Sequence, residues 1–139
     1  ALALAQAGCR VTVCARTPEK AAALAARCGG VTVSWEDLPR AAAEHGLLLN
    51  ATPLGMEGSP EFESLDFVQA LPAKAVVYDL VYHPTDTALM RAAEYRGLTA
   101  VGGLALLVQQ AALSFAHFTG IVPDAALCRD ILQELEAAQ

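Results

Sequence analysis

Short apolar runs alternate with amphipathic helical patterns along the whole chain. The runs that predict strands are Val11–Ala15, Val31–Val33, Leu47–Leu49, Ala75–Leu80 and Leu98–Val101. The patterns that predict helices lie at 17–28, in a short stretch after Ser34, and at 65–71, 87–96, 104–119 and 124–138. Strands that alternate with helices at this spacing indicate an α/β fold with a doubly wound parallel sheet and right-handed crossovers.

Local signals mark where several of these helices begin. Thr17 is expected to cap the 17–28 helix, with Pro18 in its first turn. Ser34 with Asp37 is expected to cap the short helix that follows. Gly29-Gly30 ends the 17–28 helix, because glycine is the residue that most readily closes a helix.

The first eight residues, Ala1–Gly8, have the pattern of the end of a helix with Gly8 at its carboxyl-terminal cap, and no start signal precedes them. A Rossmann-like dinucleotide domain opens with a strand, a Gly-rich turn and a helix that receives the pyrophosphate. We therefore expect a Rossmann-like domain truncated at its amino terminus, without that first strand and Gly-rich turn. Gly29-Gly30 cannot replace the turn because they follow a helix. The alternative is a complete domain whose first helix is short.

A missing first strand would leave a gap in the sheet. In the strand order 3-2-1-4-5-6, that strand lies between the Val11–Ala15 and Leu47–Leu49 strands. Its loss exposes two unpaired edges within a hydrophobic sheet, which is an aggregation hazard. We therefore expect the isolated 139-residue chain to be poorly stable.

Composition narrows the classes of function. Hydrophobic residues make up 55% of the chain and charged residues 17%, which suits a sheet covered by helices on both faces. The net charge of −6 argues against a nucleic-acid partner, since phosphate binding needs clustered Lys and Arg. Polar residues interrupt every apolar run before the roughly 18 residues of a membrane span, so we expect no membrane partner. The sequence leaves the oligomeric state open.

The cysteines and histidines predict no metal site. Cys9, Cys14, Cys28 and Cys128 form no C-x-x-C pair and lie within apolar patterns. His45, His83 and His117 have no ligand-like spacing relative to them. We expect reduced, buried thiols in a cytoplasmic protein.

Two predicted strands end in polar turns that contain Gly or Pro. The Ala75–Leu80 strand runs into Val81-Tyr82-His83-Pro84, and Leu47–Leu49 runs into Asn50-Ala51-Thr52-Pro53-Leu54-Gly55-Met56. Open α/β sheets bind ligands in the crevice at the carboxyl ends of their strands. These two turns therefore predict a ligand-binding cleft.

The end of the Val11–Ala15 strand is the position that contacts the adenosine ribose in dinucleotide-binding domains. An acidic residue there bonds a free 2′-hydroxyl, whereas an Arg accommodates a 2′-phosphate. Arg16 supplies a planar donor, Thr17 a hydroxyl and a helix-start amide, and Lys20 a second charge one turn on. This pattern favours NADP over NAD. The alternative is a solvated Arg and Lys that flank a helix start.

Further polar residues are candidates, each with a structural alternative. Asn50 is expected to bond the backbone or a ribose, and Thr52 with Pro53 to set a turn whose amides face the cofactor, although conformation alone also explains them. Tyr82 lies two residues beyond Leu80 and shares its side if the strand continues that far. There it either presents its phenol to a hydroxylated substrate or packs at the strand end.

Gln110 interrupts an apolar helical run. It shares a helix face with Leu106 and Leu107, so its amide is expected to need a partner. A substrate hydroxyl or carboxylate would serve, and a backbone carbonyl is the alternative.

Three segments together carry a family resemblance. They are Asn50-Ala51-Thr52-Pro53-Leu54-Gly55-Met56, Tyr78-Asp79-Leu80-Val81-Tyr82-His83-Pro84, and Gly102-Gly103-Leu104-Ala105-Leu106-Leu107-Val108-Gln109-Gln110-Ala111-Ala112. In this order and spacing, with Phe118–Asp124 after them, the chain resembles shikimate dehydrogenase over nearly its whole length. The resemblance implies part of an oxidoreductase that reduces 3-dehydroshikimate to shikimate with NADPH in aromatic amino-acid (chorismate) biosynthesis.

The resemblance also implies roles for individual residues. The segment Ala15–Lys20 matches the Asn-Arg-Thr segment with which the family grips the 2′-phosphate, and Ala15 replaces the usual Asn and removes one polar contact. Four further residues match family positions: Leu80 and Gly103 near the nicotinamide, and Tyr82 and Gln110 at the substrate.

The family's catalytic Lys and Asp belong to an amino-terminal substrate domain, so we expect no catalytic residue in this chain. Residues 1–139, including the helices at 104–138, are expected to form an incomplete NADP-binding domain that is inactive alone. One alternative is a quinate/shikimate dehydrogenase, although NAD-preferring members should carry an acidic residue near Arg16, and the first here is Glu19. Another is a noncatalytic nucleotide-binding scaffold domain, which would need neither Tyr82 nor Gln110.

Overall fold

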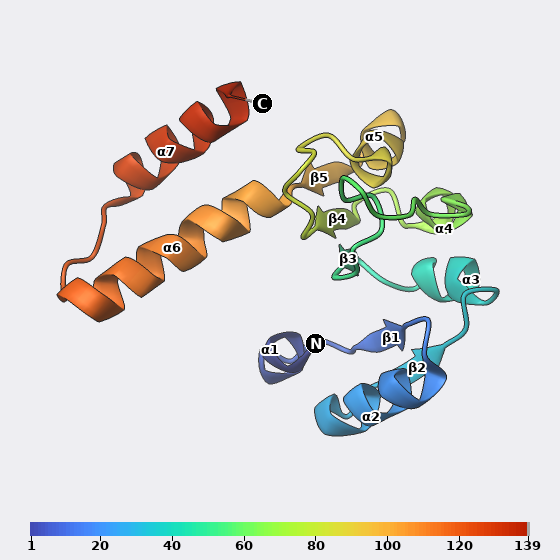
Figure 1. The fold of residues 1–139 in the computed structure, drawn as a ribbon. Coiled ribbons are helices and arrows are strands. Elements are labelled where there is room, and N and C mark those ends of the chain that lie inside the picture. Colours follow the sequence, from blue (N-terminus) through green and yellow to red (C-terminus); the bar gives the residue numbers. More distant parts are fainter. Residues whose placement is uncertain (139) are drawn as a thin grey trace.

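The structure, a computed structural model, describes residues 1–138, and its helices and strands alternate as the sequence predicts (Figure 1). The elements are α1 (Leu2–Gln6), β1 (Thr12–Cys14), α2 (Pro18–Cys28), β2 (Val31–Val33), α3 (Leu38–Ala42), β3 (Leu47–Asn50), α4 (Asp66–Ala70), β4 (Val76–Asp79), α5 (Ala88–Tyr95), β5 (Thr99–Val101), α6 (Gly103–Thr119) and α7 (Ala125–Ala137). The predicted boundaries are confirmed to within about two residues.

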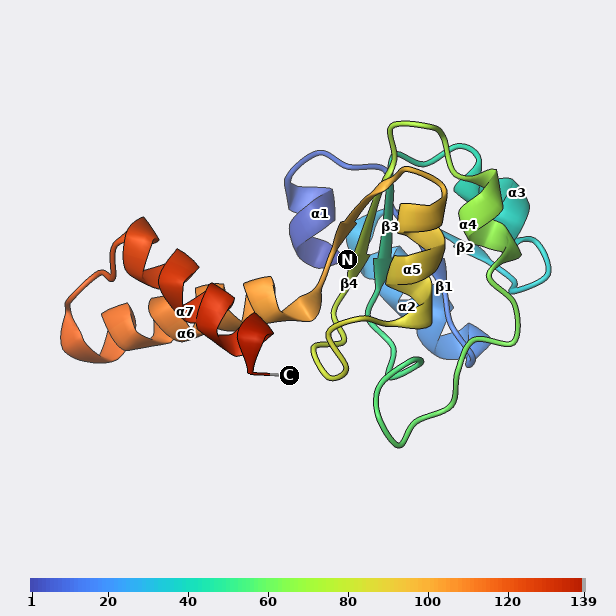
Figure 2. The same ribbon diagram turned by 90° about the horizontal axis from the view of Figure 1, so that it is seen from above.

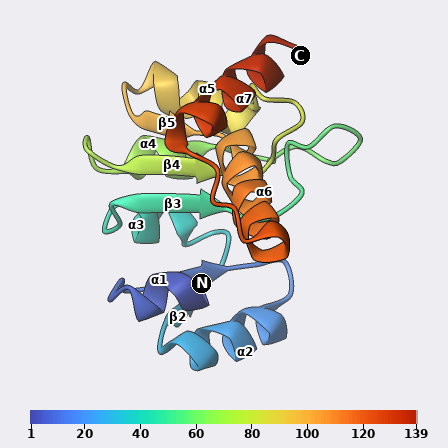
Figure 3. The same ribbon diagram turned by 90° about the vertical axis from the view of Figure 1, so that its left-hand side faces the viewer.

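The five strands of residues 1–138 form two parallel sheets. One sheet pairs β1 with β2, and the other has the order β3-β4-β5. The prediction of parallel pairing is confirmed, and so is the predicted gap, because β1 and β3 do not hydrogen-bond to each other and the strands of residues 1–138 form two separate sheets. Each sheet therefore has an unpaired edge on the side that faces the other sheet, as Figure 3 shows. That a further strand belongs between these edges stays a prediction.

The helix ends follow local chemistry, with two corrections. Gly29, at φ +64°, closes α2 as predicted, but the Thr17 side chain makes no capping hydrogen bond, so that expected cap is wrong in its chemistry. Ser34 Oγ donates to Asp37 Oδ2 and accepts from the Asp37 amide, both at 3.2 Å, in the turn before α3 and not as a cap on its first residue. The cap of α5 is well formed, because Thr87 Oγ1 accepts from the Met90 amide at 3.2 Å.

The main hydrophobic core lies where α3, α4 and α5 pack on one face of the three-stranded sheet. Its buried members are Ala42, Phe67, Val68, Leu71, Ala75, Val77, Leu89, Ala93 and Leu98. Full burial of a side chain such as Leu89 contributes about 1.5–3 kcal/mol. This core fixes β4 and α5, which flank the candidate site described below.

Helices α6 and α7 form a hairpin that extends away from both sheets (Figure 2). An apolar groove of about 360 Å³ runs between them, and Cys128 is buried there. Several apolar side chains on the hairpin face solvent, among them Leu113 and Phe118, which are 72% and 84% exposed. Within residues 1–138 no helix combines the length and the apolar character needed to cross a membrane.

A small polar contact joins the two sheets. His45 Nδ1 lies 2.8 Å from the Ala41 carbonyl, and His45 Nε2 lies 3.0 Å from Thr12 Oγ1 on β1. Because a carbonyl only accepts, Nδ1 carries the hydrogen, and in the neutral ring Nε2 accepts from the Thr12 hydroxyl. Arg10 Nη2 adds a bond of 3.2 Å to the Glu44 carbonyl.

Candidate functional site

The candidate site lies at the carboxyl ends of the strands, where a ligand crevice is expected in this class of sheet. Arg16 follows β1, Thr52 follows β3, Leu80 follows β4, and Gly103 begins α6 just after β5. The structure therefore brings to one edge residues that are 87 positions apart in the sequence, from 16 to 103. Figure 3 shows β3 and β4 ending toward α6.

Asn50, the last residue of β3, is the centre of a saturated hydrogen-bond network. Its Nδ2 donates to the Leu54 carbonyl at 3.2 Å and to Asp79 Oδ1 at 2.9 Å. Its Oδ1 accepts from the Thr52 amide at 3.0 Å and from Thr52 Oγ1 at 2.7 Å. Since an amide side chain offers two donors and two acceptor sites, all of them are used within the protein. This geometry favours the conformational role of Asn50 over a ribose contact.

The turn after β3 is held by its own side chains. The Leu54 amide donates to Thr52 Oγ1 at 3.2 Å, and the Thr52 amide is taken up by Asn50. The expectation that these amides face the cofactor is therefore wrong for Thr52 and Leu54, because each amide already donates its hydrogen bond to an acceptor inside the turn. What the turn offers a ligand is its shape and its position at the strand end.

The chain leaves the sheet directly after Asp79, one residue earlier than predicted. The condition under which Leu80 and Tyr82 would share one side, a strand that continues as far as Tyr82, is therefore not met. Val81 is buried, whereas Tyr82 is 49% exposed and accessible to a ligand. The following loop is tied back to the β3 turn region, since His83 Nε2 lies against the Glu57 carboxylate and the His83 carbonyl accepts from the Glu57 amide at 3.1 Å.

Gly103 lets the start of α6 pack directly against the backbone at the end of β4. A Cβ atom at this position would lie 2.3 Å from the Leu80 carbonyl oxygen and 2.7 Å from the Val81 carbonyl oxygen. The Gly103 amide donates to the Val81 carbonyl at 3.1 Å. Only a residue without a side chain permits this approach, so the glycine fixes how α6 leaves the sheet.

The candidate phosphate-binding residues lie after β1 on the other sheet. Arg16 and Lys20 are exposed, and Ala15 and Thr17 are half-buried. Lys20 lies in the first turn of α2, whose first residue is Pro18. Both cationic side chains are therefore accessible to a ligand at this helix start.

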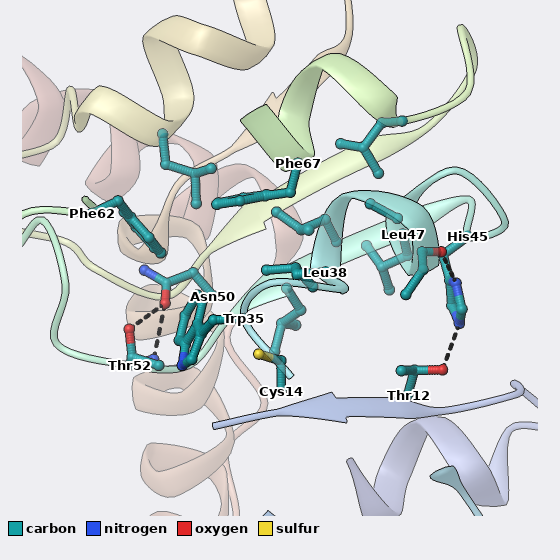
Figure 4. A pocket seen from close by; sticks show the side chains of 16 residues that line it. Thr12, Cys14, Trp35, Leu38, His45, Leu47, Asn50, Thr52, Phe62 and Phe67 are labelled. Atoms are coloured by element: carbon teal, nitrogen blue, oxygen red, sulfur yellow. Dashed lines mark hydrogen bonds between the residues drawn. The ribbon is translucent and has the colours of Figure 1, made fainter. Parts of the chain in front are cut away.

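A cavity of about 130 Å³ lies between the two sheets (Figure 4). Thr12 and Cys14 line it from β1, and Leu47, Leu49 and Asn50 line it from β3. At the end toward the candidate site it is lined by Trp35, Thr52 and Phe62. The rings of Trp35 and Phe62 pack edge to face, with their centroids 6.4 Å apart. Burial raises the pKa of the Cys14 thiol in this apolar setting.

Two expectations about buried side chains need correction. Gln110 is exposed on α6, as is Leu106, so its amide meets solvent and needs no buried partner. The four cysteines are free thiols, but Cys9 is exposed and only Cys128 is buried, so the expectation of burial is wrong for Cys9. Among residues 1–138, no group of three or more His, Cys, Asp or Glu side chains is arranged to hold a metal ion.

Two residues of this edge were not among the candidates from the sequence. Asp79 is fully buried, and Thr87 Oγ1 donates to its Oδ2 at 2.7 Å. The available signal was an acidic residue at the end of an apolar strand followed by a Thr at a helix start. A charge inside a buried strand needs partners, and this requirement could have indicated the link.

These features define a class of protein: a Rossmann-like α/β domain with candidate nucleotide-binding groups at the carboxyl edge of its parallel strands. Comparison with known proteins gives the family. The Shikimate 5′-dehydrogenase C-terminal domain family matches residues 103–133. A shikimate dehydrogenase (NADP(+)) from Acidiphilium cryptum is 46% identical over 97% of this chain and 49% of its own length.

Solved structures agree with this relationship. Shikimate 5-dehydrogenase from Thermus thermophilus, in complex with NADP(H) and shikimate, is 36% identical over 96% of this chain and 49% of its own, with a TM-score of 0.78. Quinate dehydrogenase from Corynebacterium glutamicum, in complex with NAD, is 29% identical over 90% of this chain and 46% of its own, with a TM-score of 0.77. The chain belongs to the shikimate dehydrogenase family. It spans about half the length of the curated relatives it matches and corresponds to their carboxyl-terminal portion.

Proposed function

We propose that this chain is the NADP-binding portion of an enzyme that interconverts 3-dehydroshikimate and shikimate. One observation carries the proposal: candidate groups for both ends of a dinucleotide lie along one edge of the two parallel sheets, from Arg16 after β1 to Gly103 at the start of α6. Relatives named NADP(+)-dependent shikimate dehydrogenases support it. The free thiols suit a reducing compartment, so a cytoplasmic location is part of the proposal.

The adenosine end of the cofactor would be held after β1. Exposed Arg16 can offer two parallel donors to a 2′-phosphate, and Lys20 adds a second positive charge one helical turn away. Ala15 contributes no polar group, so most of the phosphate affinity must come from the two cationic side chains. This arrangement supports NADP over NAD, since a carboxylate at this point would repel the phosphate.

The nicotinamide end would lie between the ends of β4 and β5. Leu80 and the backbone of Gly103 would form its walls, and the tight seat of Gly103 on the Leu80 carbonyl keeps these walls in fixed relation. NADPH would supply the hydride that reduces the substrate ketone. The protein's part at this edge is to orient the ring and exclude water.

The substrate would be contacted by Tyr82 and Gln110, both of which are exposed. Each offers hydrogen bonds to a hydroxylated carboxylic acid: a phenol from the loop after β4 and an amide from α6. The groups that move the substrate's proton are expected, by the family resemblance, in the remaining half of the enzyme. The chain by itself is therefore proposed to bind and orient without catalysing turnover.

The test is an assay of the complete gene product that contains these residues. We expect formation of NADPH, followed by its absorbance, when shikimate and NADP are supplied together. Quinate should replace shikimate poorly, and NAD should replace NADP poorly. A folded protein that turns over neither shikimate nor quinate would overturn the proposal and favour the noncatalytic scaffold. Faster turnover of quinate with NAD would favour the quinate dehydrogenase alternative, for which one relative of known structure provides a precedent.

A further inference from the structure

Asp79, the last residue of β4, is a fully buried carboxylate at the centre of the candidate site. No Lys or Arg among residues 1–138 forms an ion pair with it. Its partners are hydrogen-bond donors instead. Oδ1 accepts from Asn50 Nδ2 at 2.9 Å and from the Val81 amide at 3.1 Å, and Oδ2 accepts from Thr87 Oγ1 at 2.7 Å.

These bonds join three separate segments of the chain. Through Asn50 the carboxylate reaches the turn after β3, whose Thr52 and Leu54 amides depend on the same network. Through Thr87 it reaches the first turn of α5, because the same hydroxyl oxygen accepts from the Met90 amide. The network thus spans the carboxyl end of the three-stranded sheet.

The bond to Val81 sets the direction in which the chain leaves β4. It closes a turn over Leu80, whose own amide donates to the Asn50 carbonyl at 3.0 Å. The carbonyls of Leu80 and Val81 then form the seat of Gly103. A shift of the Asp79 carboxylate would therefore move both proposed walls of the nicotinamide site together.

The proposed phosphate-binding residues are outside this network. Arg16, Thr17 and Lys20 follow β1, which pairs only with β2 among the strands of residues 1–138. None of the hydrogen bonds of Asp79 described above reaches that sheet. The two ends of the cofactor would thus be held by independent parts of the structure.

We propose that Asp79 is a positioning residue, whose buried carboxylate orients the nicotinamide end of the site while leaving the adenosine end unaffected. This inference rests on the proposed function and adds a separate role to it. The role would be recognised by a change in kcat without a matching change in the KM for NADP. Loss of the carboxylate should lower kcat, because hydride transfer depends on alignment, and should leave the KM for NADP nearly unchanged, because the 2′-phosphate grip is intact.

The experiment compares Asp79→Asn with wild type in the complete gene product, using shikimate and NADP. The amide is nearly isosteric, but one acceptor oxygen becomes an NH2 group, which faces either the N–H groups of Asn50 and Val81 or the hydroxyl of Thr87. We expect kcat to fall about 10- to 100-fold, the loss that a misplacement near 1 Å causes, with a change below about 3-fold in the KM for NADP. Asp86→Asn is the matched control, since that exposed carboxylate pairs with Arg91 at 3.0 Å and should leave kcat unchanged.

A second pair of variants keeps the test decisive if Asp79→Asn does not fold. Thr87→Val removes the hydroxyl donor at nearly constant shape and should lower kcat. Thr87→Ser retains the donor, so its kcat should stay near that of wild type. An unchanged kcat in Asp79→Asn or in Thr87→Val would overturn the proposal. So would equal losses in kcat and in NADP affinity, which would indicate general destabilisation.

Hydrogen exchange separates this inference from the proposed function. In Asp79→Asn the amides of Val81, Leu54 and Gly103 should exchange faster than in wild type, while those of β1 and β2 should not change. This measurement needs no turnover. If wild type is inactive, the proposed function fails, but the exchange pattern still decides the positioning role. Faster exchange confined to the amides at this edge supports that role, and faster exchange that extends to β1 and β2 overturns it.

Discussion

Gly103→Ala gives the sharpest test of how α6 is attached to the sheet. A Cβ atom would lie 2.3 Å from the Leu80 carbonyl oxygen, where contact distances of 3.4 Å or more are ordinary, so the helix start must move by about 1 Å. The obstructing atoms are backbone, which cannot rotate away. Gly to Ala within a helix otherwise stabilises by up to about 1 kcal/mol. Overpacking costs about 1–3 kcal/mol, and the bond from the Gly103 amide to Val81 is lost as well.

We therefore expect Gly103→Ala to destabilise the folded protein by about 1–3 kcal/mol, measured by urea unfolding of the complete gene product and followed by circular dichroism. Turnover of shikimate should fall at the same time. Gly46→Ala is the control, because a Cβ atom added there would meet nothing within 4 Å and its φ is not positive. A Gly103→Ala protein as stable as wild type would refute the reasoning, since the close approach would then not constrain the helix.

Three further predictions concern other parts of the chain. Arg16→Asp should impair use of NADPH far more than use of NADH in steady-state assays, and equal losses would contradict the phosphate-binding role. Arg96→Met should cost about 1–3 kcal/mol in urea unfolding, because Arg96 Nη1 donates to the carbonyls of Val68, Gln69 and Leu71 at the end of α4. The raised pKa of the Cys14 thiol keeps it protonated to higher pH, so at pH 8 iodoacetamide should label it more slowly than exposed Cys9. Its labelling rate should still rise as the pH is raised further, and equal rates for the two thiols at pH 8 would count against burial of Cys14.

The order of elements could be predicted because periodicity and capping are local properties of the sequence. The Leu47–Leu49 and Ala75–Leu80 runs are apolar enough to mark buried strands, and Gly29 supplies the positive φ that closes α2. Where a signal depended on side-chain geometry, the prediction was less secure. Thr17 occupies the cap position of α2 without making the bond, because its identity alone does not fix the orientation of its hydroxyl.

The candidate site was only partly predictable, because its key contacts are distant in sequence. The bond between Asn50 and Asp79 spans 29 positions and depends on β3 and β4 pairing in register. The sequence left the role of Asn50 open, and the pairing partner favours a structural one. The exposure of Gln110 could not be predicted either, because the helical pattern places it beside Leu106 without revealing that this face of α6 is uncovered by the described residues.

Because Gly103 fixes where α6 meets the sheet, a change in the tilt of the helix at this residue displaces every residue along it. The helix has 17 residues and is about 25 Å long at 1.5 Å per residue. A tilt of about 5° at its first residue would carry its far end by roughly 2 Å and Gln110, seven residues along, by roughly 0.9 Å. Displacements of that size at Gln110, a proposed substrate contact, would cost about 100-fold in rate. The angular precision of one backbone contact at the sheet edge thus sets the positional precision of a side chain about 10 Å away.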